Sequence, residues 1–436
     1  MKRNSMFGVL AGLGAVALSV GITASARGAR VRDAAMASAT EARVRDADIA
    51  FYAARAARDV ESAGDRTQLA GLYLQRARAT GSNDDVLRAE DAARSSLALR
   101  TAHNGKAPMA LASALLAQHR FAEALIVARS LLASDPLRVG YRAQVAEIEM
   151  ELGHYAEADT LFRGLEHERT NLGVAPRLSR WAELHGRLDE AHALIVNARD
   201  LALRQTSMPH EQIAWFHLRV GDLAQRNGHL DEAAREFSAG LEVQPDDYRL
   251  LGARARLAAN RQQWREAIAF GERALAITLD PITLGTVGEA YAATGDSASA
   301  EDFYRTMEVA VGRQAGPFHR AWSLFLLDHD RRVPEVLARV RAEIAERHDV
   351  YGYDLLAWAL YKAGRPNEAA AADRSALQLG TRDPLLLFHA GMIARALGDT
   401  AAARRHLGDA IALNPSFHPA HAIEARAVLM QLGTGR

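Results

Sequence analysis

The sequence predicts an all-α fold, a right-handed α-solenoid of about ten helix-turn-helix repeats that follows an export or anchor segment. Three observations support it: a repeat period near 34 residues, glycine-led turns inside the repeats, and prolines after them. Small or apolar residues carry the period, at Ala89, Ala124, Ala158, Ala191, Ala233, Ala267, Ala300, Val336, Ala369 and Ala403. Successive steps are 35, 34, 33, 42, 34, 33, 36, 33 and 34 residues. A period of this length and persistence indicates stacked equivalent units rather than one globular core.

Each unit is expected to contain two antiparallel helices, A and B. Small residues allow the two helices to approach closely, and larger apolar residues at helical spacing fill the seam between them. Proline cannot continue a helix, so Pro136, Pro245 and Pro415 are expected to end helix B. Glycine steps are expected to supply the turn between A and B. They occur at Gly153, Gly186, Gly228, Gly295, Gly364 and Gly398.

One unit, from Trp215 to Pro245, shows the pattern most fully. Its members are Gly221, Gly228, Leu230, Ala233, Phe237, Gly240, Leu241 and Pro245. This pattern resembles the tetratricopeptide repeat (TPR) family, and the resemblance covers roughly residues 66–415, although few units carry every expected aromatic residue. The resemblance implies a superhelix whose A helices line a concave groove that binds protein partners.

Three departures from the pattern predict irregular places in the array. About eight extra residues lie around Asp200–Glu211 and are expected to lengthen a helix B or its loop. The unit at Pro334–Val336 has lost its alanine, and the first unit carries an insertion at Gly81–Asp85.

The N-terminus has the pattern of a secretory signal peptide or of an uncleaved membrane anchor. After a positive start, Met6–Ala24 has no charge and is followed by Ala24-Ser25-Ala26. The uncharged stretch is also just long enough for one membrane crossing, so residues 6–24 are a possible membrane contact. Arg27, Arg30 and Arg32 weaken the charge asymmetry that directs export, which leaves a non-exported N-terminus open. Both leading interpretations place the repeats outside the cytoplasm, as a periplasmic, extracellular or membrane-anchored array.

The chain is therefore expected to have four parts. Residues 1–26 form the signal peptide or anchor, and residues 27–65 form a lead-in amphipathic helix that breaks at Gly64-Asp65-Arg66. Residues 66–416 form the repeat array, and residues 417–436 form a C-terminal capping helix and tail.

Composition excludes several classes of function. The 53 basic and 53 acidic residues give a formal net charge of zero, so composition gives no electrostatic argument for nucleic-acid binding, which usually requires a basic face. The absence of cysteine excludes disulfides, thiol catalysis and cysteine-bound metals.

The sequence also contains no pattern typical of an enzyme or a cofactor site. No Gly-x-Ser-x-Gly, Walker or His-Glu-x-x-His motif occurs, and no residues outside the array are left for a catalytic domain. His418 and His421 have a spacing seen in metal sites. Pro419 lies between them and no third ligand is evident, so we expect a polar cap rather than a metal site.

The register of the small-residue ladder gives the helix-A positions that are expected to face the groove. At the C-terminal end they include Phe318, Phe325, Tyr351, Asp354, Trp358, Tyr361, Phe388, Met392 and Arg395. This set predicts an apolar pocket between Phe318 and Met392. In the middle they include Arg180, Glu183, Trp215, Asp222, Arg249, Arg256 and Glu289, which predict a mixed-charge groove. The alternative is that the aromatic side chains pack against neighbouring helices as core.

These features favour an exported or membrane-tethered scaffold that binds a peptide or partner protein in its groove, with arginine–carboxylate contacts fixing the orientation. The alternative function is a structural assembly subunit of a cell-envelope complex, acting through its convex face or N-terminal helix. An enzyme is disfavoured.

Overall fold

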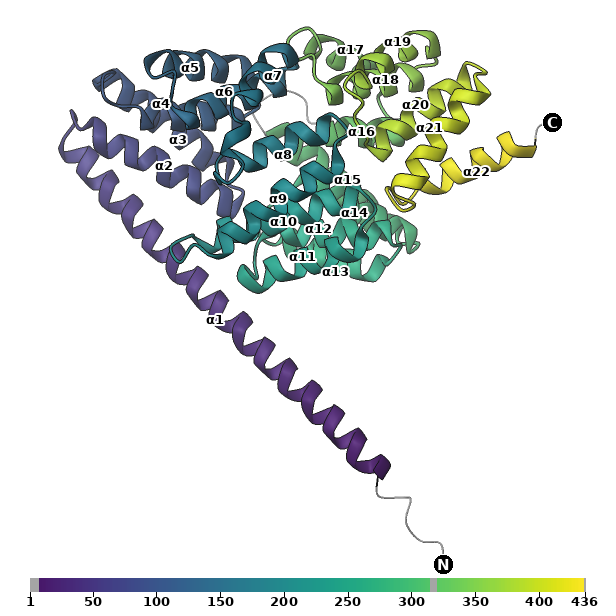
Figure 1. Cartoon of the computed structure of the whole chain (residues 1–436), viewed down its shortest axis with the longest axis horizontal. Helices are drawn as coiled ribbons and strands as arrows, with labels where there is room; N and C mark the ends of the chain where they lie inside the picture. Colours follow the sequence, from purple (N-terminus) through teal and green to yellow (C-terminus); the bar gives the residue numbers. More distant parts are fainter. Residues whose placement is uncertain (1–7, 314–319, 435–436) are drawn as a thin grey trace, which may run out of the picture.

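The computed structural model describes residues 8–313 and 320–434. Within these ranges the chain is helical, with no strand, and it begins with one long helix, α1 (Gly8–Arg58). Ten hairpins of a helix A and a helix B follow (Figure 1). They are α2 (Ala63–Thr80) with α3 (Asn83–Leu99), α4 (Lys106–Ala117) with α5 (Phe121–Ser134), α6 (Val139–Leu152) with α7 (Tyr155–Arg163), α8 (Ala175–Leu184) with α9 (Leu188–Leu203), α10 (His210–Arg226) with α11 (Leu230–Val243), α12 (Tyr248–Asn260) with α13 (Trp264–Leu275), α14 (Pro281–Ala293) with α15 (Ser297–Arg313), α16 (Arg320–Asp328) with α17 (Val333–Glu343), α18 (Val350–Lys362) with α19 (Pro366–Ala376), and α20 (Pro384–Ala396) with α21 (Thr400–Leu413). A last helix, α22 (His421–Thr434), ends the described chain, and a short 3-10 segment lies at Glu166–Glu168.

The small-residue ladder lies in the B helices. All ten of its positions are buried, and Ala300, at 3% exposure, is the most exposed of them. The ladder positions are buried because helices A and B pack closely, and glycines in the A helices allow this close packing. A Cβ on Gly221 would lie 2.3 Å from the Phe237 ring. The predicted TPR-like pairing of helices is therefore confirmed.

The predicted turns and helix ends are confirmed as well. All six predicted turn glycines have φ between 67° and 89°, the left-handed region that glycine adopts without strain. Helices α5, α11 and α21 each end two residues before the prolines at 136, 245 and 415.

Two of the three predicted irregular places are irregular. Helices α9 and α10, with 16 and 17 residues, absorb much of the longer repeat. Helix α17 has 11 residues, and Arg332 before it has a φ of 50°, in the left-handed region. The expected insertion at Gly81–Asp85 is wrong. Gly81 ends α2, and the Ser82 side chain accepts from the Asp85 amide to start α3, so this turn is tight.

The lead-in region differs from the prediction at its end. Helix α1 runs without interruption to Arg58, and the break lies at residues 59–62, because Ser62 caps a new helix that contains Gly64. In Figure 1, α1 extends away from the array. Among the described residues, the search for a helix both long enough and apolar enough to cross a membrane finds none. The positive start of the predicted signal, residues 1–3, lies outside the described residues.

The superhelix closes on itself, which the repeat pattern does not predict. The amide of His348 donates to the carbonyl of Leu152 at 2.9 Å, across nearly 200 residues of sequence. Further along, Thr381 Oγ1 donates to the carbonyl of Leu184. Later C-terminal units thus pack against the A–B turns of earlier ones.

Three of the turn glycines allow this close approach. A Cβ on Gly153, Gly186 or Gly228 would lie 2.4–2.5 Å from backbone atoms of the opposing segment. Contacts this short do not occur for real side chains, so these glycines both form the A–B turn and admit the next turn of the superhelix.

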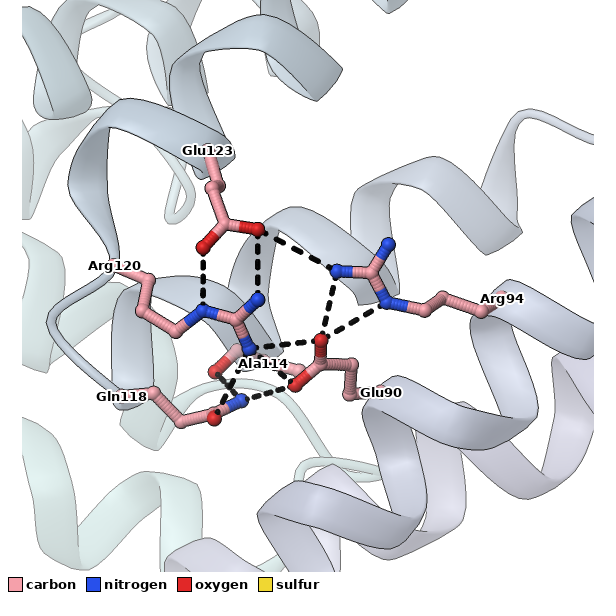
Figure 2. Close-up of polar contacts among 6 residues, drawn as sticks. All are labelled: Glu90, Arg94, Ala114, Gln118, Arg120 and Glu123. Atoms are coloured by element: carbon pink, nitrogen blue, oxygen red, sulfur yellow. Dashed lines mark hydrogen bonds and ion pairs between the residues drawn. The ribbon is translucent and has the colours of Figure 1, made fainter. Parts of the chain in front are cut away.

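Charged networks join neighbouring hairpins in addition to their apolar contacts. Figure 2 shows Glu90 of α3 accepting from Gln118 Nε2 at 2.7 Å, and from Arg120 Nη1 at 2.8 Å. Arg94 donates to the same carboxylate, and Arg120 also donates two parallel hydrogen bonds to the Glu123 carboxylate. Because Glu90 is only 7% exposed, these partners are needed to keep its charge inside the protein.

Candidate functional site

The middle of the array contains an open pocket of about 460 Å³ that is lined by three successive A helices. Its wall comes from α6, α8, α10 and the loop before α8. The lining residues are Glu147, Met150, Glu151, Leu172, Pro176, Arg177, Arg180, Trp215, Arg219 and Arg226. Four arginines and two glutamates therefore face one cavity.

Two of the four arginines share one buried carboxylate. Glu183 of α8 pairs with Arg180 at 3.1 Å and with Arg226 of α10 at 2.5 Å. Although burial opposes its ionisation, Arg226 and Arg180 lower the pKa of Glu183 to about 2. Glu183 is thus ionised at neutral pH and fixes these two guanidinium groups at the pocket wall.

Arg219 is less well compensated than the other arginines of the pocket. Its ion-pair partner Asp222 lies 3.9 Å away, whereas Arg177 reaches Glu147 at 2.6 Å. Burial and the neighbouring Arg226 lower the pKa of Arg219. The pocket therefore contains a positive charge that a bound anionic group would stabilise.

A second turn of the superhelix bounds the pocket region. The Tyr351 ring of α18 lies 5.0 Å from the guanidinium carbons of both Arg180 and Arg320. Arg180 Nη1 also lies 3.3 Å from the Tyr351 hydroxyl, across 171 residues of sequence. Burial raises the pKa of Tyr351, so the hydroxyl stays neutral. Tyr351 of α18 therefore lies next to Arg180 of the pocket lining, and we call this pocket the channel.

The structure brings only part of the predicted mixed-charge groove to this pocket. Arg180 and Trp215 line it. Arg249 instead binds Asp247 and Glu211, and Arg256 reaches Asp222 of the neighbouring A helix at 3.3 Å. These two arginines connect A helices outside the pocket lining.

Sequence reasoning missed Arg219 and Arg226. Both belong to α10 with Trp215, at steps of four and seven residues, which are the spacings that place side chains on one helix face. Extending the helical spacing from Trp215 would have found them.

The predicted C-terminal apolar pocket is packed core. Phe325, Trp358, Phe388 and Met392 are 0–5% exposed and belong to one buried cluster. The core alternative is therefore the one that the structure shows for these four side chains. These side chains are buried because a later segment of the chain covers them: the ring of His421 stacks on Phe388 at 4.5 Å.

The remaining C-terminal positions are polar or at the edge of this core. Asp354 is buried and accepts from Arg320 Nη2 and His389 Nδ1, each at 2.7 Å. Tyr361 is half-buried and stacks on Trp358, and Arg395 is exposed. The predicted groove residue Phe318 lies outside the described residues.

Comparison with protein-family models and with curated proteins gives no match. Among solved structures, the chain is similar to the APC/C hetero-tetramer Cut9–Hcn1, with 15% identity and a TM-score of 0.44 over 80% of this chain and 59% of that one. The chain thus matches less than two thirds of that protein. It is also similar to a tetratricopeptide repeat protein from Parabacteroides merdae, with 16% identity and a TM-score of 0.39 over 56% of this chain and 93% of that one. A third similar structure is PilW, a type IV pilus biogenesis factor, with 19% identity and a TM-score of 0.40 over 51% of this chain and 99% of that one.

The chain is an α-solenoid of TPR-like repeats. This conclusion rests on the order of its helices and on the buried small-residue ladder. The structural similarities, at these scores, carry no argument about function.

Proposed function

We propose that the chain is a protein-interaction scaffold that binds an acidic segment of a partner protein in the channel between α6, α8 and α10. The observation that carries this proposal is the convergence of four arginines on one cavity, with Arg219 held 3.9 Å from its carboxylate partner.

Arginine suits this role because its planar guanidinium can bind a carboxylate through two parallel hydrogen bonds. The shared contact with Glu183 holds Arg180 and Arg226 in place, which lowers the entropy lost when a ligand binds. The half-buried Trp215 offers an apolar surface beside these charges. An extended peptide with Asp or Glu residues next to an apolar residue fits this combination.

Binding also accounts for the pocket better than catalysis does. The lining residues include no Ser, Thr, Cys, His or Lys, which are common nucleophiles and bases of enzymes. Both lining glutamates are paired with arginines, Glu147 with Arg177 at 2.6 Å and Glu151 with Arg347 at 3.3 Å, although burial raises the pKa of Glu151.

The proposal includes an exported or membrane-tethered location for the repeats. Its support is the sequence pattern of residues 1–26. Fractionation of cells that express the full chain, with N-terminal sequencing of the recovered protein, tests it. Recovery of the intact chain from the cytoplasm alone would reject this part.

A peptide-binding measurement tests the channel. The probe is a fluorescein-labelled peptide that alternates Glu with Leu, compared with the same peptide carrying Gln for Glu. We expect the acidic peptide alone to bind, and Arg219→Ala to weaken it about tenfold, the effect of losing a charged hydrogen bond of about 1.5 kcal/mol.

The matched control is Arg235→Ala, because Arg235 is an exposed arginine of α11, a helix B. It should leave the affinity unchanged. Equal binding of the Gln peptide, or equal effects of the two substitutions, would contradict the proposed site.

A further inference from the structure

A cluster of two histidines and an aspartate lies at the C-terminal end of the array. Asp328 is the last residue of α16, His418 lies in the segment between α21 and α22, and His421 begins α22. Each offers a ligand atom, and these atoms all lie within 4.8 Å of one another. The third ligand that the sequence did not reveal comes from ninety residues earlier in the chain.

His421 is poorly satisfied as an ordinary buried histidine. It is 6% exposed, and neither ring nitrogen makes a hydrogen bond of normal geometry. Its Nε2 lies 3.3 Å from Asp328 Oδ2. Buried polar groups normally have hydrogen-bond partners, so this ring calls for an explanation.

We propose that Asp328, His418 and His421 form a binding site for a divalent transition-metal ion of the zinc type. Two imidazoles and one carboxylate are a ligand set that zinc accepts, with one coordination position left for water. Metal–ligand bonds near 2.0–2.2 Å at the tetrahedral angle place two ligand atoms roughly 3.4 Å apart. The contact between Asp328 and His421 already has nearly this separation.

The surroundings of the cluster also match those of a metal site. The second oxygen of Asp328 accepts a hydrogen bond from Trp358 Nε1 at 2.8 Å, which fixes the carboxylate. The other ring nitrogen of His421 faces Glu424 Oε2 at 3.8 Å. Metal-binding histidines and carboxylates commonly have such outer partners, which orient them.

His418 is held next to these two ligands by the chain itself. Its ring stacks on His421 at 4.3 Å, and its Nδ1 lies 3.3 and 3.4 Å from the amides of Ala420 and His421. Both amide contacts are long, so rotation of the ring toward Asp328 would exchange weak contacts for a metal bond.

A metal ion here would connect α16 to the start of α22. The final helix would then be held over the aromatic core by coordination as well as by packing. This site is separate from the proposed peptide channel, so each can fail without the other.

Metal titration of the full chain, purified without a histidine tag and freed of metal by a chelator, tests the site. We expect one Zn²⁺ to bind per chain by calorimetry, with a rise in melting temperature because the ion binds the folded state. Co²⁺ should give the visible absorption bands of tetrahedral coordination. A Co²⁺ spectrum with only octahedral bands, or no saturable binding, would overturn the proposal without any substitution.

Variants then locate the ion. Asp328→Asn keeps an acceptor for Trp358 and removes the charged ligand, so it should fold and bind Zn²⁺ at least about a hundredfold more weakly, beyond the 10- to 100-fold typical of outer partners. His418→Ala should act similarly. The matched control is His167→Ala, an exposed histidine far from the cluster in sequence, which should have no effect. Unchanged affinity in both Asp328→Asn and His418→Ala would mean adventitious binding elsewhere and overturn the proposal.

Discussion

The A helices in the middle of the array and those at its C-terminal end occupy equivalent positions but form different environments. Helices α6, α8 and α10 line an open cavity with arginines and glutamates. Helices α16, α18 and α20 place Phe325, Trp358 and Phe388 in a closed core. The difference teaches that equivalent helix-A positions can line a cavity or a closed core, depending on which later segments pack against them.

The covering segment explains the difference. Residues after α21 bring His421 against Phe388, and the ring of Phe417 also lies 5.9 Å from Phe388. Aromatic side chains favour this coverage, since burial of their apolar surface stabilises the fold. The arginines of the middle units line a cavity and have carboxylate partners, Glu183 for Arg180 and Asp222 for Arg219, because an unpaired charge in a closed core would cost free energy.

Trp358→Ala should have the largest effect and tests whether the C-terminal aromatic residues are core. Trp358 is 2% exposed, so its removal leaves a cavity and should lower the free energy of unfolding by about 3–5 kcal/mol. Urea denaturation followed by circular dichroism measures the change. Trp215→Ala in the open channel is the control and should cost less than half as much. Equal losses for the two substitutions would remove the contrast between the regions.

Gly153→Ala tests the contact between superhelical turns that separates the two environments. The added Cβ would meet the His348 backbone at 2.4 Å, at a φ of 82°. We expect a loss of about 2–5 kcal/mol, combining left-handed strain with overpacking. Gly364→Ala is matched, with φ of 72° and nothing within 4 Å of the new Cβ, and should cost about 1–2 kcal/mol. Thermal unfolding of the two variants compares them, and equal shifts would mean that the turns do not hold each other.

Asp354→Asn should have the smallest effect and tests the charge that borders the C-terminal core. It weakens two charge-assisted contacts, with Arg320 and His389, at a cost of about 1.5–3 kcal/mol at neutral pH. His389, through its charge and hydrogen bond, and Arg320 outweigh burial and hold the pKa of Asp354 below the ordinary value of an aspartate. The contribution of the carboxylate is therefore present above about pH 4 and is lost as the pH falls through the lowered pKa.

Stability measured from pH 7 down to pH 2 should accordingly show the unaltered chain and Asp354→Asn converging in acid. A constant difference across this range would contradict an ionised Asp354 in the core.

The local structure was largely predictable because the same small, glycine and proline positions recur in successive repeats. The buried ladder, the six glycine turns and the proline-ended helices follow from helix pairing and backbone sterics, which act over a few residues. The pocket was only partly predictable. Arg180 and Trp215 were predicted from the repeat register, whereas Arg219 required the helical face of α10. In the separate histidine cluster, Asp328 could not be predicted, because its contact depends on which distant helices meet.

The sequence by itself determined the architecture: ten hairpins, their small-residue seams and their turns. These features depend on local sterics and on packing between neighbouring helices, and the residues of each repeat determine both. The tertiary structure decided which helix-A side chains remain open. That outcome depends on contacts between segments nearly 200 residues apart, such as Leu152 with His348 and Leu184 with Thr381. No periodic pattern encodes such a contact, because the winding of the whole superhelix brings its two sides together.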